Sequence, residues 1–357
     1  MSEINSMDTQ IHSSLRTVEW KDNSVVMIDQ TKLPNELVYV KYTDYNDVAD
    51  AIRNLVVRGA PAIGVSGAFG LALAVLQSKV TDKESLLKDL EHAKKILFET
   101  RPTAINLAWG LERIMNVARS GKDTSEIRNN IVHEAKIMAE EDIAINKRMG
   151  KNGSHLFHDN DTIMTHCNAG ALATVAYGTA LGVIRATKES GKKIKVIATE
   201  TRPVMQGSRL TAFELKHDGI DVSLIPDTAV GYSMVNGLVS KVIVGADRIL
   251  ATGHVYNKIG TYQVALMAKQ HGIPFYVAAP LSTFDMKSTP KDVVIEQRKP
   301  SEVTGVAGKK TAPDDINVIN PAFDMTPPEL ISGIITESGV AEPPFDVSIK
   351  KLFDSKL

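Results

Sequence analysis

The chain has 357 residues, more than the ~100–200 residues usual for one domain, so we expect two domains. Lys and Arg (41) nearly balance Asp and Glu (42), and the net charge of -1 excludes the strongly basic surface of a nucleic-acid-binding protein. A single cysteine excludes an internal disulfide, and the N-terminus has neither the basic start nor the apolar run of a secretion signal. We therefore expect a cytoplasmic protein without nucleic-acid or membrane partners.

The first 150 residues are expected to be mainly helical. Residues 24–30 and 38–43 predict a small pair of strands, and apolar side chains at helical spacing follow in four segments, 44–57, 83–99, 103–118 and 125–149. Residues 59–76 are uncharged for about the minimum length of a membrane-spanning helix. That segment contains Pro61 and four glycines and lacks an aromatic belt, which favours a buried, tightly packed helix instead.

The pattern changes after the polar stretch 150–161, which we take as the domain boundary. Short apolar runs recur at 163–166, 194–198, 222–225, 242–244 and 275–278, separated mostly by helical segments such as 172–188 and 260–269. Strands that alternate with helices predict a parallel sheet. The tail beyond Lys299 is rich in proline around one expected helix, 329–337, and should wrap over the sheet or a partner chain.

Polar or reactive residues directly follow each of the five apolar runs. In chain order these are Cys167, residues 201–206, Asp227, Asp247 and Pro280. The carboxyl ends of parallel strands lie at one edge of a doubly wound sheet, where such folds bind ligands. These residues are therefore expected to converge on one site.

Cys167 lies between an expected strand and a helix expected to start near Ala171, whose unpaired N–H groups would favour a thiolate. Alternatively, it is a buried cysteine that packs as a small apolar side chain. The sequence contains no CxxC or HExxH pattern, so we expect no metal site.

Asp247, in the stretch VIVGADRI, is expected at the same edge of the sheet as Cys167. A partly desolvated carboxyl group there would have a raised pKa and act as a general acid. The alternative is an ordinary capping residue or an ion pair with Arg248.

Four places set a cation or amide beside an expected helix start, where backbone N–H groups bind anions: 58–60, 101–103, Arg202 and 257–260. Each cation alone is explained by solvation, but four in a chain without net charge indicate a phosphorylated substrate. The glycine-rich segment 64–70 matches neither a P-loop nor a GxGxxG motif, so we expect no nucleotide cofactor, and no other cofactor is indicated.

Seven blocks, taken in order, resemble the methylthioribose-1-phosphate isomerase family over residues 25–344. They are VVRGAPAIG (56–64), TRPTAINLAWG (100–110), THCNAGALAT (165–174), ETRPVMQGSRLTAFEL (200–215), VGADRI (244–249), NKIGTYQVA (257–265) and NPAFDMTPPELI (320–331). The resemblance implies an α/β fold in which a mainly helical N-terminal domain with a small β-sheet (1–150) precedes a Rossmann-like parallel-sheet domain (151–357). It also implies a homodimer.

The resemblance further implies a reaction and its residues. The family converts 5-methylthioribose 1-phosphate to the corresponding ketose in methionine salvage, so the expected substrate is a phosphorylated pentose. Cys167 and Asp247 would be the catalytic pair, and the implied substrate-binding residues are Arg58, Gly59, Ala60, Arg101, Gln206, Asn257 and Lys258.

The C1 phosphate blocks the free aldehyde, so an acid must open the sugar ring, and Asp247 would supply that proton. Hydrogen then moves from C2 to C1, either as a proton taken by a Cys167 thiolate or as a hydride. Two alternatives stay open. One is isomerisation of 5-deoxyribose 1-phosphate or ribose 1,5-bisphosphate, and the other is a non-catalytic regulatory subunit of a nucleotide exchange factor, which belongs to the same superfamily.

Overall fold

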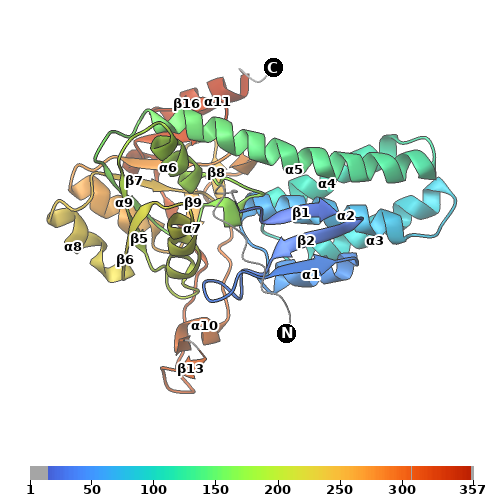
Figure 1. The fold of residues 1–357 in the computed structure, drawn as a ribbon, viewed down its shortest axis with the longest axis horizontal. Helices are drawn as coiled ribbons and strands as arrows, with labels where there is room; N and C mark the ends of the chain where they lie inside the picture. Colours follow the sequence, from blue (N-terminus) through green and yellow to red (C-terminus); the bar gives the residue numbers. More distant parts are fainter. Residues whose placement is uncertain (1–14, 307, 355–357) are drawn as a thin grey trace, which may run out of the picture.

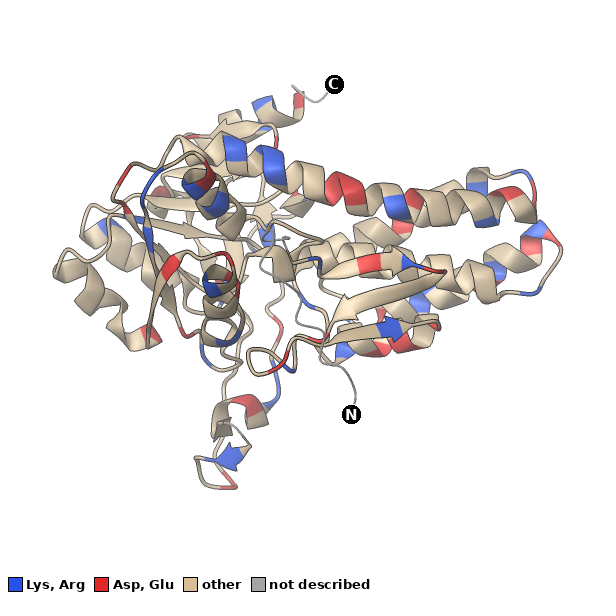
Figure 2. Cartoon of the chain, in the orientation of Figure 1, with Lys and Arg blue, Asp and Glu red and all other residues tan. Residues whose placement is uncertain are grey.

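The computed structural model describes residues 15–306 and 308–354. Figure 1 shows two regions joined by one long helix, α5 (Thr124–Ser154), which runs from the first region onto the second. Acidic and basic residues are interspersed along this helix (Figure 2), in keeping with the balanced composition of the chain.

The first region combines a small antiparallel sheet with four helices. The strands are β1 (Val18–Lys21), β2 (Ser24–Ile28) and β3 (Tyr39–Tyr42), paired in that order. The helices are α1 (Tyr45–Arg53), α2 (Ala60–Gln77), α3 (Lys83–Phe98) and α4 (Ile105–Ser120). Asp44, Asp82 and Asp123 cap α1, α3 and α5, because each carboxylate accepts a hydrogen bond from a backbone N–H in the first turn.

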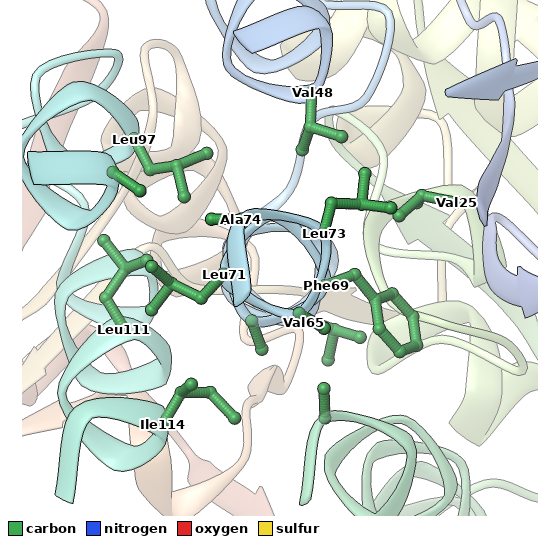
Figure 3. Close-up of a cluster of buried hydrophobic side chains, with 14 of the residues drawn as sticks. Val25, Val48, Val65, Phe69, Leu71, Leu73, Ala74, Leu97, Leu111 and Ile114 are labelled. Carbon is green, nitrogen blue, oxygen red and sulfur yellow. The ribbon is translucent and has the colours of Figure 1, made fainter. Parts of the chain in front are cut away.

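Helix α2 forms the centre of the first core. Figure 3 views it end-on, with buried side chains from α1, α3, α4 and β2 packed around it. Within the described ranges it is the one helix long and apolar enough to cross a membrane, and 78% of that stretch is buried inside the protein. A Cβ atom on Gly110 would lie 2.6 Å from the Gly64 carbonyl oxygen, so glycine permits the close approach of α2 and α4.

The second region is built on a seven-stranded sheet in the order β16-β15-β10-β7-β4-β5-β6. Every neighbouring pair is parallel except β15 and β16. The strands are β4 (Thr162–Thr165), β5 (Lys195–Thr199), β6 (Asp221–Ile225), β7 (Lys241–Val244), β10 (Phe275–Ala278), β15 (Gly333–Thr336) and β16 (Gly339–Ala341). The five apolar runs are therefore the five strands β4, β5, β6, β7 and β10, and the predicted α/β fold class is confirmed.

Helices and a second sheet complete this region. The helices are α6 (Ala180–Glu189), α7 (Ala212–His217), α8 (Val230–Val235), α9 (Thr261–Gln270), α10 (Pro300–Thr304) and α11 (Phe345–Asp354). Strands β11 (Phe284–Asp285), β8 (Arg248–Leu250), β9 (Val255–Lys258) and β14 (Phe323–Thr326) form a four-stranded sheet that the sequence did not predict. Helix α10, β12 (Gly305–Val306) and β13 (Lys309–Lys310) form an arm that projects from the body in Figure 1.

Two expected helices are wrong. The helix expected over 172–188 begins only at Ala180, because residues 171–173 form a single 3₁₀ turn and Tyr177 and Gly178 adopt positive φ (74° and 87°). The helix expected over 329–337 is a short 3₁₀ turn followed by β15, whose buried Ile334 and Ile335 extend the sheet beside β10. The apolar run there is too short to distinguish strand from helix by its spacing.

The division of the chain at residue 150 stays a prediction. Helix α5 is continuous across it. Its first half contributes Ile127 and Ile131 to the core around α2, while Met149 belongs to a core beneath the seven-stranded sheet, so one helix serves both regions.

Candidate active site

One pocket lies between the first region and the carboxyl-end edge of the seven-stranded sheet. All nine residues predicted for the site line it: Arg58, Gly59, Ala60, Arg101, Cys167, Gln206, Asp247, Asn257 and Lys258. The sheet contributes residues that follow β4, β5 and β7, and the second sheet contributes the end of β9. The first region contributes the start of α2 and the loop before α4, so residues distant in sequence meet at the predicted edge.

Cys167 is held rigidly at the end of β4. Its side chain is almost fully buried, and its backbone has a left-handed φ of 63°. The Cys167 N–H donates to the Thr201 hydroxyl (2.9 Å), and the Cys167 carbonyl accepts from the Thr211 hydroxyl (2.6 Å). A non-glycine residue in this conformation persists only when its surroundings fix it, and such residues gather at functional sites.

The environment of the Cys167 thiol differs from the one we expected. Burial raises its pKa, and Asp247 adds to that effect, whereas the cations Arg58 and Lys258 oppose it. We expected the N–H groups of a helix N-terminus to favour the thiolate, and this expectation is wrong. The N–H groups of Ala171 and Leu172 donate to the carboxylate of Glu214 instead. The sulfur is therefore held as a thiol to a higher pH than an ordinary cysteine.

Asp247 opens onto the pocket directly after β7. Its backbone N–H donates to the Tyr256 carbonyl (2.9 Å), but in residues 15–306 and 308–354 nothing forms a hydrogen bond or ion pair with its carboxyl group. Burial raises the pKa of Asp247, although nearby cations, Lys258 first among them, oppose the shift. The alternative of an ion pair with Arg248 is wrong, because Arg248 pairs with Asp285 (3.3 Å).

The start of α2 brings Arg58 and Gly59 into the pocket. The Arg58 guanidinium donates to both the carbonyl oxygen (3.0 Å) and the side-chain oxygen of Asn168, and burial lowers its pKa. Gly59 has φ 96°, and a Cβ atom there would lie 2.4 Å from the Ala173 carbonyl oxygen, so only glycine fits. Within the described chain, Arg58 Nε and Gln206 Oε1 are buried without a hydrogen-bond partner. Buried polar atoms without a partner are uncommon in folded proteins.

Lys258 and Asn257 lie at the end of β9. Lys258 Nζ donates to the Ala322 carbonyl (2.9 Å) and lies 4.6 Å from the centre of the Phe323 ring. Burial lowers the pKa of Lys258, while Cys167 and Asp247 oppose that shift. The Asn257 amide donates to the Thr261 hydroxyl (3.0 Å), which fixes its side chain against the start of α9.

The tail adds residues that the sequence did not indicate. Arg298 and Phe323 line the pocket, and Arg298 pairs with Glu302 (2.5 Å) and Glu296 (3.1 Å). Glu296 also pairs with Arg101 (3.3 Å), so it links the tail to the first region. Glu296 and Arg298 belong to no periodic segment and Phe323 begins the short strand β14, so spacing in the sequence did not indicate them.

Two residues that we expected in the site, Arg202 and Asp227, form hydrogen bonds with backbone groups instead of lining the pocket. Arg202 does not line the pocket, because its guanidinium donates to the carbonyl groups of Pro203 and Val303. Asp227 accepts hydrogen bonds from the backbone N–H groups of Thr201 (2.8 Å) and Arg202 (2.6 Å). In the part of the chain that the structure describes, His, Cys, Asp and Glu side chains form no cluster suited to a metal ion.

Comparisons with known proteins identify similar chains. The sequence profile of the Initiation factor 2 subunit family matches residues 56–343. The "Methylthioribose-1-phosphate isomerase" of Thermosipho africanus is 54% identical over 339 residues, which cover 95% of this chain and 98% of the relative.

Two solved structures are also similar. The 5-methylthioribose 1-phosphate isomerase of Pyrococcus horikoshii has a TM-score of 0.89 and 48% identity, and the match covers 95% of this chain and 96% of that one. A protein described as "translation initiation factor eIF-2B, subunit delta" from A. fulgidus has a TM-score of 0.86 and 50% identity, covering 96% and 100%. Both functional names thus occur on the same fold at nearly equal distance from this chain.

Proposed function

The chain belongs to the initiation factor 2 subunit family, and we propose that it isomerises 5-methylthioribose 1-phosphate to 5-methylthioribulose 1-phosphate. It is an enzyme that interconverts an aldose and a ketose, with a role in methionine salvage. The observation that carries the proposal is the convergence of an unpaired carboxyl group, a thiol and several cations in one pocket.

Asp247 serves as the acid that opens the ring. Its raised pKa keeps a proton on the carboxyl group to a higher pH than in an ordinary aspartate, and no described residue competes for that proton. Transfer to the ring oxygen breaks the bond between that oxygen and C1, and C1 keeps its phosphate. A positioned acid of this kind contributes about 10²–10⁴-fold to a rate.

Hydrogen then moves from C2 to C1 while the C2 hydroxyl group loses its proton and becomes the ketone. In one route C2 releases a proton to the Cys167 sulfur and C1 takes a proton back. In the other a hydride passes directly to C1 and Cys167 stabilises the charge. Burial keeps Cys167 as a thiol, which supports the hydride route. Isomerisation in D₂O distinguishes them, because only the proton route permits deuterium to enter at C1.

The cations of the pocket bind the phosphate and orient the sugar. The Arg58 guanidinium is held by Asn168, and Lys258 is desolvated between its carbonyl partner and the Phe323 ring. Arg101 approaches from the first region with Gly59 and Ala60, whereas Gln206 and Asn257 approach from the second region. Charge-assisted hydrogen bonds in such a pocket are shorter and stronger than neutral ones.

Phosphorus NMR tests the proposal directly. Purified protein is incubated with 5-methylthioribose 1-phosphate, and ribose 1,5-bisphosphate and 5-deoxyribose 1-phosphate are run in parallel. Preferential conversion of the methylthio sugar to its ketose is expected. Preference for another sugar would contradict the substrate, and no conversion of any would favour the regulatory-subunit alternative.

The homodimer and the cytoplasmic location remain part of this proposal. The exposed apolar side chains of Tyr232 and Val235 on α8 (66% and 67% exposed) offer one surface for self-association. Sedimentation of the purified chain tests the homodimer, since a monomer at micromolar concentration would contradict it.

A further inference from the structure

Glu214 on α7 is a fully buried carboxylate beside the pocket that the proposed reaction does not use. One of its oxygens accepts from the Asn168 amide (2.8 Å) and the Leu172 N–H (3.1 Å). The other accepts from the Ala171 N–H (2.7 Å) and from Arg185 (2.7 Å). Four donors thus converge on two oxygens that can only accept.

Three of these donors belong to the loop that begins at Cys167. The loop has no regular structure before its short 3₁₀ turn, so side chains rather than a helix must hold it. The fit is close, because a Cβ atom on Gly170 would lie 2.2 Å from a Glu214 carboxylate oxygen. Glu214 therefore organises the backbone that carries the thiol.

The same carboxylate acts on Arg58 through Asn168. The Asn168 amide nitrogen donates to Glu214, while its side-chain and backbone oxygens accept from the Arg58 guanidinium. This orientation of the Asn168 amide is fixed, because exchanging its nitrogen and oxygen would place two donors against each other. Arg58 faces Cys167 in the pocket together with Lys258 and Asp247.

We propose that Glu214 is a positioning residue, which acts through the 167–172 loop and Asn168 to hold the Arg58 guanidinium beside the Cys167 thiol. Arg185 anchors the far side of Glu214 and pairs in turn with Asp218 (2.6 Å). The inference rests on the proposed function only where turnover is the readout.

The lone cysteine permits a test without substrate. Alkylation of Cys167 by iodoacetamide is followed against pH in the parent chain and in Glu214→Gln, in which an amide donor must meet one of the four donors. The charges that face the sulfur are Arg58, Lys258 and Asp247. We expect the midpoint of the profile to rise by about one pH unit when Arg58 loses its orientation, at the lower end of what a nearby opposite charge contributes.

Two further variants keep the test sharp. Asn168→Ala removes the side-chain oxygen that holds Arg58, together with the amide hydrogen bonds to Glu214 and Thr211. It should shift the profile in the same direction, so it carries the test if Glu214→Gln does not fold. Asp161→Asn is the matched control, because Asp161 is a nearly buried carboxylate paired with Lys241 (3.0 Å) at the opposite end of β4. It should lower the unfolding temperature and leave the alkylation profile unchanged.

Turnover supplies the second readout. With the methylthio substrate, kcat should fall about tenfold to a hundredfold in Glu214→Gln and Asn168→Ala, the scale for a misplaced reacting group. Folded variants with the parental alkylation profile would overturn the inference, whatever their turnover. A shifted profile in a chain that isomerises no sugar would support the inference and reject the proposed function.

Discussion

Two clusters of buried ionisable side chains are linked through Asn168, and they are paired in opposite ways. The support cluster consists of Arg185, Glu214 and Asp218, which form two ion pairs of 2.7 and 2.6 Å. The pocket cluster consists of Arg58, Cys167, Asp247 and Lys258. Within the described ranges no ion pair joins its members to one another or to any other side chain.

Electrostatics reflects that difference. In the support cluster, burial lowers the pKa of Arg185, but Glu214 and Asp218 outweigh it, so that this pKa is raised and the charge is stabilised. In the pocket cluster, burial prevails at every member and shifts each pKa towards the neutral form. Both clusters are buried. The paired charges of the support cluster stabilise the fold, whereas the unpaired groups of the pocket cluster can interact with a ligand.

Asp247→Asn should have the largest effect on catalysis. The amide has the shape of the carboxyl group but no proton of suitable acidity, so kcat should fall about 10²–10⁴-fold. The unfolding temperature should not fall, because no hydrogen bond of this carboxyl group is lost. Steady-state kinetics and a thermal melt measure both, with Asp285→Asn as a control that breaks only the ion pair with Arg248. Near-parental turnover would remove Asp247 from the mechanism.

Arg185→Met should have the largest effect on stability. It leaves Glu214 and Asp218 buried without their cation, and breaking a buried pair costs about 3–5 kcal/mol. Urea unfolding measures the loss. The comparison between the two clusters fails if Lys258→Met, which breaks no ion pair in the described chain, costs as much free energy of unfolding as Arg185→Met.

Asp142 lies between the two cases, because among the described residues its carboxyl group has a backbone partner but no ion pair. It accepts from the Val175 N–H (2.7 Å), and burial raises its pKa to about 7. The unfolded chain releases this proton near pH 4, so the folded state binds more protons between about pH 4 and pH 7. The contribution of Asp142 to the free energy of unfolding is therefore fully present below about pH 4, and it is lost as the pH rises to about 7.

The slope of stability against pH measures this contribution. Asp142→Asn should remove a decline that amounts to on the order of a few kcal/mol between pH 4 and pH 7. Urea unfolding at a series of pH values gives both curves. Parallel curves for the parent and the variant would show that burial without a cation has no cost at this position.

Arg101→Ala should have the smallest of these effects. The side chain already pairs with Glu296, so the substrate replaces a partner rather than filling an empty position. We expect about a tenfold loss in kcat/KM, expressed mainly in KM. Arg202→Ala is the matched control, because Arg202 lies outside the pocket and should leave the kinetics unchanged. Equal effects of the two substitutions would reject a role for Arg101 in binding.

The sequence was most informative where local pattern and topology agree. Five short apolar runs predicted five strands of one sheet, and the rule that parallel strands end at one edge predicted that Cys167, Gln206 and Asp247 meet there, as they do in the pocket. Helix α3, which has an aspartate cap and apolar spacing, was predicted to within one residue at each end, whereas α1 ends four residues earlier and α5 five residues later than predicted.

The remainder depended on tertiary contacts. The four-stranded sheet is made of strands of two to four residues, too short to show a period, and it forms only because β14 returns from the tail to pair with β9. The loop after Cys167 has a helical composition, yet Glu214 binds its N–H groups from another part of the chain. Arg298 reaches the pocket on an irregular segment, for which sequence spacing provides no signal.

Helix α5 has a mechanical consequence. Its 31 residues span about 46 Å as one rod, which is fixed in the core of both regions. A hinge at residue 150 would therefore have to break main-chain hydrogen bonds within the last turns of this helix. Because α5 joins the two regions as one rod, Arg58 and Arg101 of the first region are held opposite Cys167 and Lys258 of the second region. We therefore expect substrate to enter by movement of loops such as the tail segment with Glu296, rather than by bending of α5.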